Sequence, residues 1–117
     1  MRYLCLIYLN EDEMAAQPAA EVRDLNVGHL ELNDQLRLSG HLIEAEALQP
    51  SSEAVTIRPR RGKVSLTDGP FTESKELVAG FYLIDAADLD DAIGIASSFP
   101  GAQHGAVEIR RVRALDV

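Results

Sequence analysis

The chain has 117 residues, of which 46% are hydrophobic and 26% charged, and this is the composition of one ordinary globular domain. We therefore predict a single domain over residues 1–117. Its formal net charge of -8 would repel phosphate backbones, which argues against nucleic acid as a partner. No apolar run approaches the roughly 20 residues that cross a bilayer, so we predict a cytoplasmic protein without a membrane partner.

Residues 3–9 are apolar at nearly every position and β-prone, which predicts a strand that is covered on both faces. The only cysteine, Cys5, lies inside this run. A single cysteine excludes an intrachain disulfide and a CxxC metal or redox site. We expect Cys5 to pack in the core.

After a polar stretch at residues 10–18, apolar side chains recur at helical spacings of three and four. The stripe consists of Val22, Leu25, His29, Leu32 and Leu36. This periodicity predicts an amphipathic helix that ends near Ser39 and Gly40. Because His29 lies in the middle of the apolar stripe, its ring should point toward the sheet.

The rest of the chain reads as further strands and one helix. A short strand is predicted at residues 42–43, and residues 55–58 and 63–66 alternate around Arg61-Gly62 as an exposed or edge hairpin. Residues 77–84 form another apolar strand. A helix capped by Asp88 follows, Pro100-Gly101 ends it, and residues 106–110 form the closing strand.

This order of elements predicts an α+β fold, a ferredoxin-like βαββαβ core enlarged by a hairpin. Both helices of such a core lie on one face of an antiparallel sheet. The central strands are apolar on both faces, so the other face would remain as a large exposed patch. The simplest cover is a second subunit, and we therefore predict a homodimer.

Three histidines are candidates for chemistry. His29 on the sheet-facing side of a helix is either a structural, hydrogen-bonded imidazole or a catalytic one. His41 and His104 occupy positions typical of turns and strand ends. Histidines so dispersed, without an HxH or HExxH pairing, do not form a metal site, and we predict neither a metal nor a cofactor.

Residues 68–76 are unusual because turn formers, an aromatic and alternating charges lie between two strands. A tight Asp-Gly turn with Phe71 in the core explains the first part of the segment. It does not require a carboxylate at Asp68 or charges at Glu73 and Lys75. Asp68 therefore has either a turn role or a role in lining a site.

Cationic side chains concentrate at residues 58–63 and 110–113 of this acidic chain. The first group belongs to the predicted hairpin and the second follows the closing strand. A solvated hairpin tip is the favoured interpretation, and a site for a small anion or an acidic partner is the alternative.

The segment at residues 68–76, DGPFTESKE, followed by GFYLI at residues 80–84, resembles DGPF-type proteins of the YCII-related family. The similarity extends to residues 1–4, 46–50, 88–92 and 105–110. It implies a single YCII-related domain with the dimeric α/β-barrel type of ferredoxin-like fold, which agrees with the sheet-covering argument.

The resemblance also implies a function. The shorter YciI-like relatives are thought to use a His-Asp pair, which here implies His29 as an acid/base group with Asp68 or Glu46 as the orienting carboxylate. We also predict Glu73, Lys75 and Tyr82 as ligand-binding residues.

The implied reaction is proton abstraction from a small organic molecule, as in a dehydrochlorinase or lyase. The alternative is a non-catalytic binding or regulatory dimer, associated with a partner linked to extracytoplasmic-function sigma factor signalling.

Overall fold

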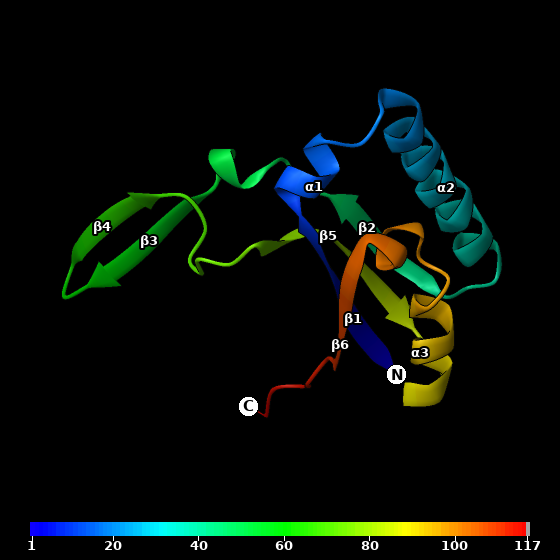
Figure 1. The fold of residues 1–117 in the computed structure, drawn as a ribbon. Coiled ribbons are helices and arrows are strands. Elements are labelled where there is room, and N and C mark those ends of the chain that lie inside the picture. Colours follow the sequence, from blue (N-terminus) through cyan, green and yellow to red (C-terminus); the bar gives the residue numbers. More distant parts are fainter. Residues whose placement is uncertain (117) are drawn as a thin grey trace.

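The computed structural model of the chain describes residues 1–116 and shows an α+β fold (Figure 1). The main sheet is built from β1 (Arg2–Asn10), β2 (Leu42–Ala47), β5 (Glu76–Asp85) and β6 (Gly105–Arg111). The helices are α1 (Glu11–Ala15), α2 (Ala19–Leu38) and α3 (Leu89–Ala96), and the two short 3-10 helices are η1 (Ser51–Glu53) and η2 (Pro100–His104). β3 (Val55–Arg60) and β4 (Lys63–Asp68) form a separate hairpin.

The four main strands are ordered β2-β5-β1-β6, and every neighbouring pair is antiparallel. α2 and α3 lie on the same side of this sheet (Figure 1). The described residues include no helix that is long and apolar enough to cross a membrane.

The core lies between the helices and one face of the sheet. The strands contribute Tyr3, Cys5, Ile7, Tyr82 and Ile84, and the helical side contributes Leu36, Ala92, Ala96 and Phe99. Cys5 is fully buried, as predicted, and burial raises the pKa of its thiol to about 11. Cys5 is therefore an unreactive packing group at neutral pH.

The opposite face of the sheet carries the alternate residues of the same strands, and neither α2 nor α3 lies on it (Figure 1). Its centre is apolar and half-buried, made of Leu4, Leu6, Tyr8, Phe81 and Leu83. We call this the open face. The prediction that β1 is covered on both faces therefore holds only on the helix side of a single copy.

Several elements differ from the sequence prediction. The 3-10 helices η1 and η2 were not predicted, and α3 ends at Ala96, before the predicted stop at Pro100-Gly101. α1 begins at residues predicted as a polar connection, and Asn10 caps it by accepting a 3.0 Å hydrogen bond from the Glu13 N–H. This five-residue helix has no room for an apolar stripe, so periodicity could not reveal it. β2 continues to Ala47 and is longer than predicted. Its acidic residues Glu44 and Glu46 face solvent, so the strand lacks the apolar run on which the prediction relied.

The β3–β4 hairpin confirms the local prediction, with Arg61 and Gly62 at its turn. Both residues have positive φ, 50° and 78°, as a type I′ turn requires. The two strands pair only with each other, and the hairpin projects from the body of the molecule (Figure 1).

Candidate functional site

His29 is placed by the middle of α2 against the helix-side face of β5. Its Nδ1 lies 2.6 Å from the hydroxyl oxygen of Tyr82. Its Nε2 accepts a 3.1 Å hydrogen bond from the backbone N–H of Gly101 in η2. The predicted orientation of the ring toward the sheet is confirmed, and both ring nitrogens are engaged.

The Gly101 contact determines the tautomer of His29. A nitrogen that accepts from an N–H cannot carry a proton, so the proton of the neutral ring resides on Nδ1. Nδ1–H therefore donates to the Tyr82 oxygen. The hydroxyl proton of Tyr82 is then free to be donated to another group.

Burial keeps both side chains uncharged. Desolvation lowers the pKa of His29 below its ordinary value of 6.5, and the Gly101 N–H, which faces Nε2, opposes protonation there. Desolvation also raises the pKa of Tyr82 to about 12. At neutral pH the pair is thus a neutral imidazole beside a neutral phenol.

Packing fixes the position of Tyr82. Its ring stacks on Phe99 with centroids 4.0 Å apart, and only 4% of its surface is exposed. Gly101 is held just as closely, because a Cβ at this position would lie 3.2 Å from His29 Nε2 and 3.3 Å from Ile7 Cγ2. The positions of His29 and Tyr82 are therefore fixed by close packing.

A pocket of about 450 Å³ lies beside this pair, between α2 and strands β1, β2 and β5. Its walls are largely apolar, with Ile7, Leu9, Leu25 and Leu30 among them. Asn26 and Asn33 supply polar groups. Such a mixture is typical of sites for small organic molecules.

Asn33 adds an unusual feature to this wall. Its side-chain oxygen is buried and has no hydrogen-bond partner within residues 1–116. Buried polar atoms in folded proteins are nearly always paired, so an unpaired one marks a place where a partner is expected.

The two predicted orienting carboxylates are not hydrogen-bonded to His29. Glu46 lines the same pocket, but the register pairs it with Phe81, so its side chain lies on the open face while His29 lies on the helix side. Asp68 is the last residue of β4, in the projecting hairpin. Among the predicted site residues, Tyr82 is the one that contacts His29.

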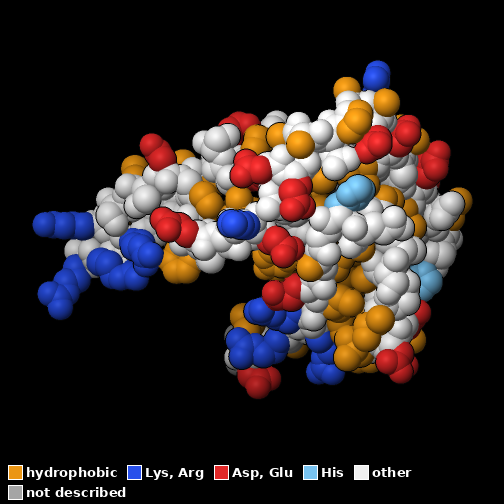
Figure 2. All heavy atoms as spheres, viewed as in Figure 1, with side chains coloured by type: hydrophobic (Ala, Val, Ile, Leu, Met, Phe, Trp, Pro, Cys, Tyr) orange, Lys and Arg blue, Asp and Glu red, His pale blue; other side chains and the backbone are white. Residues whose placement is uncertain are grey.

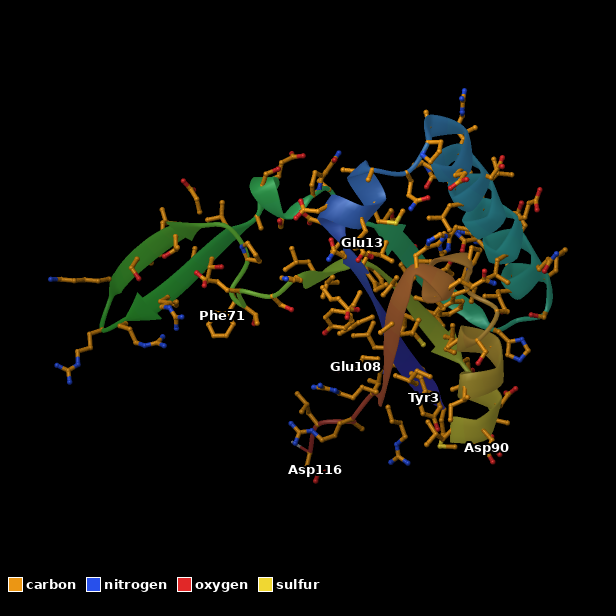
Figure 3. All side chains as sticks on the ribbon, in the orientation of Figure 1. Tyr3, Glu13, Phe71, Asp90, Glu108 and Asp116 are labelled. Atoms are coloured by element: carbon orange, nitrogen blue, oxygen red, sulfur yellow. The ribbon has the colours of Figure 1, made fainter. Side chains whose placement is uncertain are left out.

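The remaining residues of the 68–76 segment lie at the surface. Glu73 and Lys75 are exposed in the connection between β4 and β5. Phe71 was expected in the core and is instead 69% exposed, with the Arg58 guanidinium 4.8 Å from its ring centroid (Figure 3). The expectation failed because β4 belongs to the hairpin, not to the main sheet.

The other histidines take no part in the pocket. His41 lies 2.7 Å from the Ser39 hydroxyl and 4.0 Å from an Asp91 oxygen, and His104 ends η2. In the part of the chain that the structure describes, no three His, Cys, Asp or Glu side chains gather closely enough to hold a metal ion.

Three residues of the site were not found from sequence. Gly101 was recognised only as a helix stop, Phe99 only as a helix-face residue, and Asn33 not at all. Asn33 lies one helical turn after His29, and that spacing was the available clue.

Comparison with known proteins places the chain in a family. The model of the YCII-related domain matches residues 1–116. The chain is also 34% identical over 116 residues to an uncharacterized protein, R00369, of Rhizobium meliloti (strain 1021), and the match covers 94% of this chain and 90% of that protein. The protein therefore belongs to the YCII-related family.

Proposed function

We propose that the protein binds a small organic molecule in the pocket beside His29, with the Tyr82 hydroxyl as the group that meets the ligand. The observation that carries this proposal is the direction of the hydrogen bonds. Gly101 donates to His29 and His29 donates to Tyr82, so the remaining proton of the chain belongs to Tyr82. A ligand oxygen is the natural acceptor for it.

This arrangement favours ligands whose oxygen carries or gains negative charge, such as a carboxylate or a polarised carbonyl. A preorganised donor in a largely apolar pocket stabilises such charge. His29 then acts as a positioning residue, since it orients the phenol and offsets the charge on its oxygen. It differs from the general base implied by the family resemblance, because a proton can reach Nε2 only if the Gly101 bond breaks.

The second candidate is a non-catalytic binding protein. It is favoured by the same fact, that both nitrogens of His29 are satisfied within the chain and neither partner is a carboxylate. A sigma-factor-linked partner belongs to this candidate. Its binding would persist after His29→Ala and fail after changes at Glu73 or Lys75.

We also propose that the fold is the ferredoxin-like, dimeric α/β-barrel type. The strand order β2-β5-β1-β6, with both longer helices on one face, supports the ferredoxin-like topology. The apolar centre of the open face supports a homodimer, because a second sheet would remove Leu6, Phe81 and their neighbours from water.

The binding proposal is tested with a panel of small carbonyl-containing and carboxylate-containing fragments, followed by two-dimensional amide NMR. We expect shifts at pocket residues such as Ala45 and Ala79, and Tyr82→Phe should weaken binding roughly threefold to tenfold, the worth of one hydrogen bond. Tyr8→Phe is the matched control because Tyr8 lies on the open face. Fragments that bind elsewhere, or bind Tyr82→Phe as well as wild type, would contradict the proposal.

A further inference from the structure

Residues 55–68, which comprise β3, the Arg61-Gly62 turn and β4, form a projecting arm with two unlike faces. Cross-strand pairing places Ile57 opposite Leu66 and Pro59 opposite Val64, and Val55 continues the same face at the base of the arm, opposite Asp68. The other face carries Thr56, Arg58, Arg60, Lys63, Ser65 and Thr67. One side of the arm is thus apolar and the other polar and cationic.

The apolar side of the arm is exposed to solvent in a single copy. Ile57 is 56% and Leu66 70% exposed. An isolated two-stranded hairpin is marginally stable in water and needs a further strand, sheet or helix against its apolar side. The radius of gyration, 16.1 Å, also exceeds the roughly 13 Å expected for a compact chain of this length. These features indicate that the apolar side of the arm packs on a second surface.

Charge indicates what that surface is. The arm contains four cations and one acid, a net charge of +3, whereas the rest of the chain contains seven cations and 18 acids, a net charge of -11. In Figure 2, Lys and Arg side chains gather at the tip of the arm and in a second group at the lower edge of the body near the C-terminal end, and acidic side chains are spread over the rest of the body. Two whole copies repel each other, but the arm of one attracts the body of the other.

We propose that the arm packs its apolar side on the body of a second copy of this chain, reciprocally about a two-fold axis. This inference rests on the homodimer proposed above and assigns the arm as part of the dimer contact. The same surface on both copies makes such a contact self-complementary and closed. The border of the open face carries the acids Glu44 and Glu46 on β2, and Glu108 on β6, which is paired with Arg110. The arm lies against this border in our proposal, because the second sheet covers the apolar centre.

The test measures the dimer dissociation constant by sedimentation equilibrium. The double variant Ile57→Ser/Leu66→Ser removes one cross-strand pair from the apolar side. We expect its dissociation constant to rise roughly tenfold or more, because two buried aliphatic side chains are lost. The matched control is Thr56→Ser/Thr67→Ser, which trims a cross-strand pair on the polar side, retains a hydroxyl at each position and should change the constant less than about twofold.

A second variant removes the arm altogether, so that its effect on dimerisation cannot come from a misfolded arm. The Ala54 carbonyl accepts a 2.7 Å hydrogen bond from the Gly69 N–H, which is the bond that closes a two-residue turn. Residues 55–68 can therefore be replaced by Asn-Gly without disturbing β5. The armless chain should keep the thermal unfolding cooperativity of the body and should dimerise as weakly as the Ile57→Ser/Leu66→Ser variant, or more weakly.

The outcomes separate the two proposals. An armless chain that dimerises like wild type overturns the arm assignment and leaves the sheet-to-sheet homodimer standing. A wild-type chain that is monomeric at micromolar concentration overturns both. Equal effects of the two double variants would also overturn the arm assignment. Ligand binding at Tyr82 is measured separately and is not decided by any of these results.

Discussion

At the scale of single residues, the site depends on three groups that share two hydrogen bonds. The backbone N–H of Gly101 determines which nitrogen of His29 is protonated, and His29 in turn determines where the Tyr82 proton can go. The stacked Phe99 holds the phenol in place. A backbone amide far away in sequence thus controls the hydrogen-bonding direction of a side chain in the pocket.

The lowered pKa of His29 has a consequence for stability. The unfolded chain takes up a proton near pH 6.5, whereas the folded chain resists it, so the stabilisation from a neutral His29 is complete above pH 6.5 and is lost as the pH falls below it. We expect urea-induced unfolding to show a steeper loss of stability from pH 7 to pH 5 in wild type than in His29→Gln. His104→Gln is the control and should keep the wild-type slope; equal slopes in all three proteins would contradict the buried, neutral imidazole.

The sequence predicted the orientation of His29 but not its partners. Spacing along one helix is sufficient to place His29 on the sheet side. Whether Asp68, Glu46 or Tyr82 meets the ring depends on strand register and on which sheet each strand joins. Those are long-range properties, and a shift of one residue in register would move Glu46 to the other face.

At the scale of elements, the sequence predicted turns and caps well where a few adjacent residues determine them. The hairpin turn at Arg61-Gly62 and the Asp88 cap of α3 are both predicted from adjacent residues, and both are confirmed. α1 was missed because one turn of helix buries no stripe. Phe71 was misplaced because the residues around it do not indicate which sheet the neighbouring strand joins.

The α3 cap gives a measurable prediction. Asp88 accepts a 2.8 Å hydrogen bond from the Asp91 N–H, and Asp91 accepts a 2.9 Å bond from the Ala87 N–H, so each satisfies a backbone donor at the start of the helix. Asp88→Ala should lower the free energy of unfolding by about 1 kcal/mol in urea titration. Asp90→Ala, in the same turn but outside the cap, should cost clearly less; an equal loss would assign the effect to helix-dipole charge instead.

At the scale of the whole molecule, the chain divides into a body with a buried helix side and a projecting arm with an exposed apolar side. Buried side chains such as Ile84 and Phe99 hold the body together, and none of the fully buried ones comes from the arm. The open face and the arm both expose apolar surface, and in our proposal both are covered by the second copy.

The open face can be tested independently of the arm. Leu6 lies opposite Phe81 at its centre and is half-buried in a single copy, so Leu6→Glu places a charge where a second sheet would exclude water. We expect a monomer in sedimentation velocity at concentrations where wild type is dimeric. The control, Val27→Glu, adds the same charge on α2 at a side chain that is already 50% exposed, and it should remain dimeric. An unchanged dimer in Leu6→Glu would contradict the covering of the open face by a second sheet.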